Sequence, residues 1–304
     1  MKPILATQSA TSWRSHMPIT NTAFVPNMTN KTVIVTGANS GIGFATAKML
    51  AKRGARVVLA VRDIAKGEKA ASGISGITEV RKLDLASLAS IRAFASDWQN
   101  PVDLLINNAG VTSPSLRRTA DGFELQFGTN HLGPFALTNL LLPNITGRVV
   151  TVGSQAEQMG RIDFDDLNWE RTLYSEFRSY ANSKLANLLF TAELQRRLSA
   201  ANSRVIATVA HPGLVSSNIY DEATGLVMRL MVRLAAQSPE WGALPVLYAA
   251  VADIPGNSFV GPRNLFHMRG APEIIKSSKA ACNDELAKQL WTTSEQLTRV
   301  QFAI

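Results

Sequence analysis

The feature that most constrains the fold is a glycine-rich turn between a short apolar segment and an amphipathic one. Residues 32–36 are β-branched and almost wholly apolar, which is typical of a strand buried on both faces. Residues 41–53 follow a helical pattern. Gly37 permits the tight turn, Gly41 lets backbone amides approach a pyrophosphate, and Gly43 allows close packing. We therefore predict a dinucleotide site, with a loop that merely holds three glycines as the alternative.

Strand and helix patterns continue to alternate beyond this turn. Repeated βα units with short loops imply a parallel sheet that is covered by helices on both faces. We therefore predict an α/β fold in residues 29–304, namely a single Rossmann-type, doubly wound parallel sheet of about seven strands. Further strands are expected at 56–61, 78–83, 102–106, 147–152, 203–209 and 256–261, and helices at 63–72, 87–98, 121–142, 219–238 and 283–299.

Residues 1–28 differ in composition from the rest of the chain. They are rich in Ser, Thr and Asn, contain three prolines and hold no acidic residue. Their only apolar run is too short for the core of a signal peptide. We expect this segment to be a flexible N-terminal extension.

The residue that follows the second predicted strand bears on the choice of nicotinamide cofactor. In dinucleotide folds an acid near this point binds the ribose 2′-hydroxyl of NAD, whereas an arginine accommodates the 2′-phosphate of NADP. Val61 stands where the acid would be, and Arg62 follows it. We therefore favour NADP(H) over NAD(H). An ordinary solvated charge at a strand end is the alternative.

Tyr180 and Lys184 lie four residues apart, so on a helix one side chain stands above the other. A nearby ammonium favours the ionised form of a phenol, which suits general acid–base chemistry at an alcohol or carbonyl oxygen. The spacing is weak evidence by itself, because it arises by chance in long chains. Neither Tyr174 nor Tyr220 has a lysine at the same spacing.

The net charge of +8 does not indicate a nucleic-acid partner. The chain has 31 Lys and Arg against 23 Asp and Glu, but the basic residues are spread out and form no long run. A basic balance also suits an enzyme that holds a phosphorylated anionic cofactor, which is the interpretation we prefer.

Cysteine usage and hydropathy exclude several further classes. Cys282 is the single cysteine, which excludes an internal disulfide and a cysteine-based metal site. This fits a reducing compartment, and we expect a cytoplasmic protein. No window approaches the length of a transmembrane helix. Asp163, Asp165 and Asp166 cluster without a histidine, so we expect a solvated loop there and no metal.

Taken together, the motifs resemble those of the short-chain dehydrogenase/reductase family. The matching positions, in the family's order, are Thr36–Gly43, Asp84-Leu85, Asn107–Gly110, Asn130, Ser154, Tyr180, Lys184 and Pro212-Gly213. Segments 61–63, 130–135 and 183–190 resemble the retinol-dehydrogenase-like branch. The resemblance implies an oxidoreductase that transfers a hydride between the nicotinamide and a small lipophilic alcohol, aldehyde or ketone. A homodimer is compatible with the resemblance.

The resemblance also implies a role for each matching residue. Tyr180 would be the general acid or base, Ser154 would bind the substrate oxygen, and Lys184 would hold the nicotinamide ribose. Asn130 would hold a water that links the lysine to solvent. The cofactor would be bound by Gly37, Asn39, Ser40, Gly41, Ile42, Gly43, Arg62, Asp84, Leu85, Asn108, Ala109, Gly110, Tyr180, Lys184, Pro212, Gly213, Val215 and Ser217.

Two departures from the family pattern stand out. Gly153 occupies a position at which many relatives carry a serine, and the gap between Ser154 and Tyr180 is about twice the commonest one. The retinol-dehydrogenase-like branch has a similar insertion. His131 and His211 flank motif residues, and we expect both to be structural, because the phenol and the ammonium already supply the proton chemistry.

Three other functions were weighed against the oxidoreductase. A catalytically silent NADP(H)-binding sensor or scaffold would have no need of an intact serine, tyrosine and lysine set. A light-driven reductase of the protochlorophyllide type would be expected to use a cysteine near the site. A nucleic-acid binder would need a basic cluster.

The predicted helix at 219–238 is a candidate lid over an apolar substrate, with plain core and a membrane-surface helix as alternatives.

Overall fold

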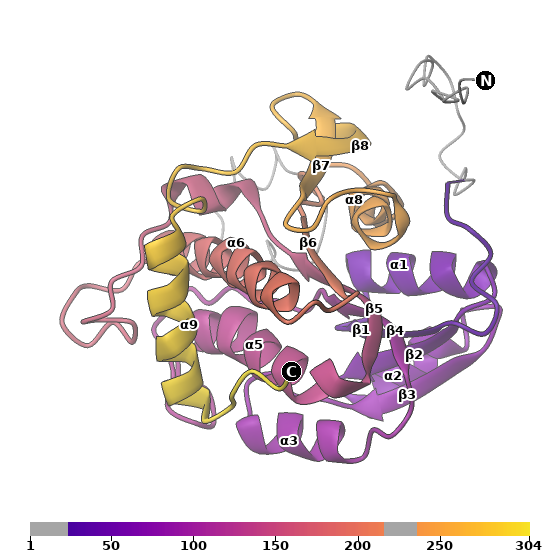
Figure 1. Ribbon diagram of the computed structural model, residues 1–304, viewed down its shortest axis with the longest axis horizontal. Helices are drawn as coiled ribbons and strands as arrows, with labels where there is room; N and C mark the ends of the chain where they lie inside the picture. Colours follow the sequence, from indigo (N-terminus) through magenta and orange to yellow (C-terminus); the bar gives the residue numbers. More distant parts are fainter. Residues whose placement is uncertain (1–23, 216–235) are drawn as a thin grey trace, which may run out of the picture.

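The computed structural model describes residues 24–215 and 236–304, and one eight-stranded sheet forms its centre (Figure 1). The strand order is β3-β2-β1-β4-β5-β6-β7-β8. All neighbours pair in parallel except β7 and β8, which are antiparallel. The strands are β1 (Thr32–Thr36), β2 (Arg56–Val61), β3 (Thr78–Lys82), β4 (Val102–Asn107), β5 (Ile145–Val152), β6 (Ile206–Ala210), β7 (Phe259–Asn264) and β8 (Arg269–Ile275).

Helices cover both faces of the sheet (Figure 1), so the predicted doubly wound α/β fold is confirmed. Alternate strand residues point to opposite faces: Val33 and Val35 pack on one side, and Ile34 packs on the other. The first face carries α1 (Gly41–Lys52), α2 (Ile64–Ala71) and α8 (Pro239–Val251), and the second carries α3 (Leu88–Ser96), α5 (Gly133–Leu141), α6 (Glu176–Ala200) and, packed against α6, α9 (Asp284–Thr298).

The helix predicted for residues 121–142 is present, but it begins later and is not a regular α-helix throughout. The chain instead forms a short α4 (Leu125–Phe127), a π-helical turn η1 (Gly128–Leu132) and then α5. The carboxylate of Glu124 accepts hydrogen bonds from the amides of Gln126 and Phe127, which fixes the helix start at residue 125. A π turn adds a residue to the helix, and such turns are frequent at functional sites.

The sequence analysis does not predict α8 or β8. Helix α8 is apolar on nearly all sides because it is buried between α1 and the sheet, so it lacks a helical period in hydrophobicity. Strand β8 contains Gly270 and Pro272, which disfavour a strand, but it lies at the sheet edge, where proline is tolerated. The predicted helix at 219–238 lies almost wholly outside the described residues.

The packed part of the chain begins before the predicted boundary at residue 29. Residues 1–23 lie outside the described part. Val25 and Met28, however, are buried against α1 and neighbouring strands, so the last residues of the predicted extension belong to the core.

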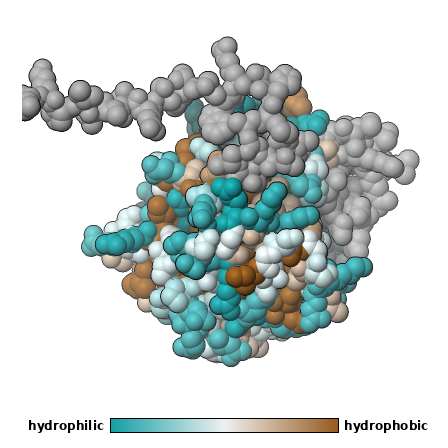
Figure 2. Space-filling view, turned by 90° about the vertical axis from the view of Figure 1, so that its right-hand side faces the viewer, coloured by the Kyte–Doolittle hydropathy of each residue, from teal (hydrophilic) through white to brown (hydrophobic). Residues whose placement is uncertain are grey.

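On the face shown in Figure 2, hydrophobic residues are scattered among hydrophilic ones, and the large apolar clusters are internal.

An aromatic cluster joins α5, α6 and α9. Trp291 of α9 is 1% exposed. Its ring lies 4.9 Å from that of Phe135 and 5.9 Å from that of Phe190, measured between centroids. The guanidinium of Arg197 lies 4.5 Å from the centre of the indole. These contacts hold the C-terminal helix against α6.

We expect Trp291→Ala to lower the free energy of unfolding by about 3–5 kcal/mol, because it removes a large buried ring and leaves a cavity. Urea unfolding followed by circular dichroism measures this loss. Leu173→Ala is the control, since Leu173 is 92% exposed; its effect should stay within about 0.5 kcal/mol. Equal effects of the two substitutions would contradict the proposed anchoring of α9.

Candidate active site

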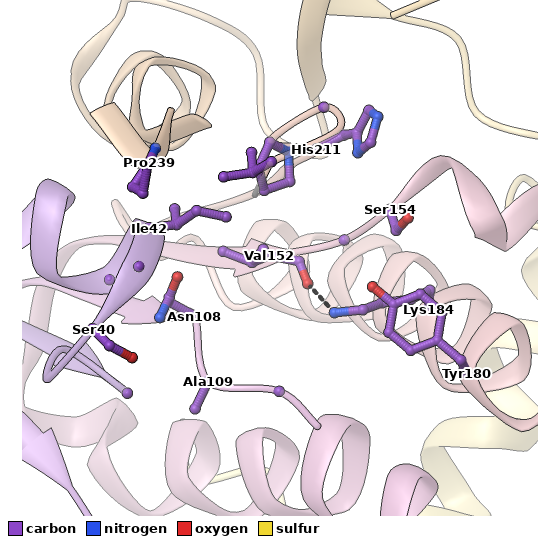
Figure 3. Close-up of a pocket in the computed structure, with 18 of the residues that line it drawn as sticks. Ser40, Ile42, Asn108, Ala109, Val152, Ser154, Tyr180, Lys184, His211 and Pro239 are labelled. Atoms are coloured by element: carbon purple, nitrogen blue, oxygen red, sulfur yellow. Dashed lines mark hydrogen bonds between the residues drawn. The ribbon is translucent and has the colours of Figure 1, made fainter. Parts of the chain in front are cut away.

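The carboxyl ends of the central parallel strands surround a cleft of about 360 Å³ (Figure 3). Loops that follow β1, β4, β5 and β6 form its walls, together with the start of α1 and one face of α6. Ligands bind at this edge in sheets of this type. The lining residues are Gly37, Asn39, Ser40, Gly41, Ile42, Gly43, Asn108, Ala109, Gly110, Val152, Gly153, Ser154, Tyr180, Lys184, His211, Pro212, Gly213, Val215 and Pro239.

The glycine turn after β1 has the conformation that a dinucleotide site requires. Gly37 has a φ of +66°, and a Cβ there would lie 3.0 Å from the backbone of Ala109. Gly41 has a φ of +55°, and no heavy atom lies within 4 Å of its Cβ position. Ser40 caps α1 without a side-chain hydrogen bond. The first amides of α1 thus border the open cleft, which fits a pyrophosphate group.

Thr36 joins this turn to the loop after β4. Its buried hydroxyl accepts hydrogen bonds from the amides of Asn108 and Ala109, both at 3.0 Å. The side-chain amide of Asn108 donates to the Thr36 carbonyl at 2.8 Å. From the sequence, Thr36 was predicted only as the first residue of the Thr36–Gly43 motif, without a role of its own. The sequence does hold a clue to these hydrogen bonds, namely a threonine at the carboxyl end of a mostly apolar strand.

Three polar side chains gather at the end of the cleft away from the glycine turn (Figure 3). The Lys184 ammonium donates to the Val152 carbonyl at 3.0 Å and lies 5.5 Å from the centre of the Tyr180 ring. Ser154 follows β5 and accepts from the Ala156 amide at 3.2 Å. Because α6 and β5 meet here, residues that are distant in the sequence converge on one small volume.

Glu157 holds the turn in which Ser154 lies, and the sequence analysis does not identify it. Its buried carboxylate accepts from the amide and the hydroxyl of Ser278, at 2.9 and 2.5 Å. Burial raises the pKa of Glu157, and the two hydrogen bonds oppose that rise. A loop that follows β8 therefore supports the short helix η3 (Gln155–Met159) behind Ser154.

Asn130 lies behind the cleft and does not line it. It sits in η1, where its amide donates to the Val111 carbonyl and to the Ser183 hydroxyl, each at 3.0 Å. A Cβ added to Gly110 would lie 3.4 Å from Asn130 Oδ1 and 3.7 Å from Lys184 Nζ. The asparagine is thus a neighbour of the lysine across Gly110. Its role in a proton relay stays a prediction.

Arg62, Asp84 and Leu85 are also outside the cleft lining. Arg62 is exposed just beyond the end of β2, which is the strand next to β1. The Asp84 carboxylate accepts from the Ala86 amide at 2.9 Å, and Leu85 is buried. Ser217 lies outside the described residues. The cofactor roles of these four residues stay predictions.

Four lining residues were not predicted for the site. They are Val152, Gly153, His211 and Pro239. The loop that contains Pro212 and Gly213 is held by Gln237, whose side-chain amide donates to the Pro212 carbonyl at 2.7 Å. Pro239 is the first residue of α8, a helix that was not predicted, and Gln237 lies just before it.

Among the described residues that line the cleft, Lys184 is the only charged one, and none is an acid. Burial lowers its pKa from 10.5 to about 8. A positive, acid-free cleft suits an anionic cofactor. The geometry therefore combines a phosphate-binding turn at one end with a serine, a tyrosine and a lysine at the other.

Comparisons with known proteins assign the family. The model of the family described as short chain dehydrogenase matches residues 31–225. Human retinol dehydrogenase 13 is 43% identical over 295 residues, which cover 89% of this chain and 85% of that protein. Human polyprenol dehydrogenase is 39% identical over 294 residues, which cover 90% and 87%. The crystal structure of an uncharacterized protein from Mycobacterium paratuberculosis is similar, with a TM-score of 0.82 at 50% identity, covering 93% of this chain and 98% of that one.

The chain therefore belongs to the short-chain dehydrogenase family and is an oxidoreductase that resembles the retinol dehydrogenases. Membership implies an NAD(P) cofactor and a small-molecule substrate. Among the described residues, no helix has the length and hydrophobicity to cross a membrane. The same part of the chain contains no cluster of acids, histidines and cysteines that could hold a metal ion. The cytoplasmic location and the homodimer stay predictions.

We expect Lys184→Met to stabilise the cofactor-free protein at pH 7 while it impairs function. Below pH 8 the lysine is charged in both the folded and the unfolded chain, and burial costs free energy only in the folded one. The pKa shift corresponds to at most about 3 kcal/mol, and loss of the hydrogen bond to Val152 removes about 1 kcal/mol of that gain.

Urea unfolding at pH 7 should therefore show Lys184→Met about 1–3 kcal/mol more stable than the wild type. The difference should shrink as the pH rises from about 8 towards 10.5, because the wild-type folded state loses the buried charge in that window. Lys279→Met, an exposed lysine, is the control. A less stable Lys184→Met protein at pH 7, or a difference that does not change with pH, would contradict this account.

Proposed function

We propose that the protein interconverts a lipophilic alcohol and its aldehyde or ketone with NADP(H). The observation that carries the proposal is the position of Ser154, Tyr180 and Lys184 at one end of a cleft whose other end is a phosphate-binding turn. A cofactor on the turn would extend its nicotinamide towards the three side chains. A protein that only bound the cofactor would have no need of this acid–base set.

In the direction of reduction, each residue has a separate task. When bound, the nicotinamide supplies the hydride. The Tyr180 hydroxyl donates a proton to the substrate oxygen, and the Ser154 hydroxyl holds that oxygen in place. The Lys184 ammonium holds the ribose hydroxyls and favours the ionised phenol that remains after the proton is transferred. We propose that Asn130, next to Lys184 across Gly110, orders the water through which the proton is replaced.

Arg62 supports the preference for NADP(H). It follows β2 beside the strand that bears the glycine turn, and Val61 replaces the acid that would bind an unphosphorylated ribose. Lys82 lies nearby, since its ammonium donates to the Arg62 carbonyl at 2.6 Å. Two cations at this edge favour a 2′-phosphate. The lipophilic substrate is supported by the relatives, which are named for retinol and polyprenol.

We expect Tyr180→Phe to lower kcat by about 10²–10⁴-fold with little change in cofactor affinity, because it removes the proton donor and leaves the ring. NADPH consumption with a panel of aldehydes and ketones measures kcat, and fluorescence titration measures NADPH binding. Tyr248→Phe, on α8 and outside the cleft, is the control. Cofactor binding without turnover by the wild type across the whole panel would favour a silent sensor or scaffold instead.

We expect Arg62→Ala to raise the KM for NADPH by about 10–100-fold, because charge-assisted hydrogen bonds to the phosphate are lost. The KM for NADH should change by less than about threefold, since NADH carries no 2′-phosphate. Arg171→Ala removes an exposed arginine of the insertion and serves as the control for net charge. Equal changes for both cofactors would refute the assignment of Arg62.

A further inference from the structure

His211 lines the cleft, yet the mechanism above does not use it. The side chain is only 4% exposed, and neither ring nitrogen makes a hydrogen bond of good geometry within the described parts of the chain, where the His267 backbone is its nearest polar contact. A buried polar atom without a partner destabilises the folded protein. Another buried histidine, His131, differs because its Nε2 atom is hydrogen-bonded to the Ser294 hydroxyl at 2.9 Å. His211 is therefore a candidate to bind a ligand.

Backbone pairing fixes the position of His211 in the sheet. The His211 amide donates to the Val260 carbonyl at 2.7 Å, which sets the residue just beyond β6, between the end of β5 and the first residues of β7. Its neighbours across the sheet are both glycines, Gly153 and Gly261. A Cβ added to Gly261 would lie 3.6 Å from the Cδ2 atom of the ring. The ring therefore packs beside Gly261.

The alternation of the strands places the imidazole on the α6 face of the sheet. Ala210 packs with the α1 face, whereas Val209 packs with the α6 face, so the next residue, His211, points towards α6. Helix α6 carries Tyr180 and Lys184. Figure 3 shows the His211 ring at the same end of the cleft as Ser154, away from Ser40 and the glycine turn. The ring therefore borders the place where the reacting part of the substrate would lie.

The imidazole is neutral at physiological pH. Burial, together with the charges of His267 and Lys184, lowers the pKa of His211 to about 3, and the contact with the His267 backbone opposes this shift. A neutral imidazole offers one N–H donor and one lone pair. A hydroxyl group, which also donates and accepts, is its natural complement. Ser154 and Tyr180 already serve the reacting oxygen, so the imidazole is left for a second oxygen.

We propose that His211 binds a second oxygen of the substrate, next to the reacting carbon. This selects α-hydroxy ketones, and the corresponding vicinal diols, over compounds that lack the oxygen. The inference rests on the proposed function, since it assumes that the reacting oxygen sits between Ser154 and Tyr180. A site built to hydrogen-bond a hydroxyl discriminates against the analogue without it, because that analogue leaves the buried polar group unpaired.

The test compares 2-hydroxyacetophenone with propiophenone, which has a methyl group in place of the hydroxyl. We expect His211→Phe to lower kcat/KM for the hydroxy ketone about tenfold relative to propiophenone, which corresponds to one hydrogen bond. His211→Asn, which keeps a donor and an acceptor, should restore part of the discrimination. His267→Phe is the control, because that histidine is near but does not line the cleft.

Two results would overturn the inference. One is an equal loss for both ketones in His211→Phe, which would make the residue structural. The other is a selective loss of NADPH affinity, measured by fluorescence titration, which would assign the imidazole to the nicotinamide carboxamide. Reduction of propiophenone by the wild type tests the proposed function separately. If neither ketone is reduced, calorimetric dissociation constants of the pair with NADPH present still decide whether His211 distinguishes them.

Discussion

Parallel pairing of β1, β4, β5 and β6 is the constraint on which the site depends. Parallel neighbours end at the same edge of a sheet, so the residues that follow each strand meet there regardless of their distance in the sequence. The glycine turn, the Asn108 loop, Ser154 and His211 all enter the cleft in this way. Helix α6 then needs only to lie against β5 for Tyr180 and Lys184 to face them.

The same edge holds groups that lower the stability of the cofactor-free fold. The ammonium of Lys184 is buried with a lowered pKa, and the imidazole of His211 is buried without a partner among the described residues. Both arrangements are unfavourable in a protein interior and are found where a ligand completes them. The aromatic packing of Trp291 against α6 supplies compensating burial at a distance from the cleft.

Much of the fold could be predicted, because buried parallel strands and the glycine turn have strong local patterns. Strand β1 and helix α9 lie within a residue of the expected bounds. Helix α8 could not be found, since burial on nearly all sides removes its periodicity. In the site, Gly37 and Tyr180 belong to recognisable motifs. Glu157 could not be found because its role depends on a hydrogen-bond partner, Ser278, that only the three-dimensional arrangement brings to it.

The position of α9 has a consequence for how the protein is made. This helix is synthesised well after α5 and α6, yet its Ser294 bonds to His131, and the Thr298 carbonyl accepts from Arg92, more than 150 residues earlier in the chain. The side of α6 that α9 covers therefore stays uncovered until α9 has been synthesised. During that interval the nascent chain exposes an apolar surface that other molecules can bind, so this protein has reason to depend on chaperones while it is being synthesised.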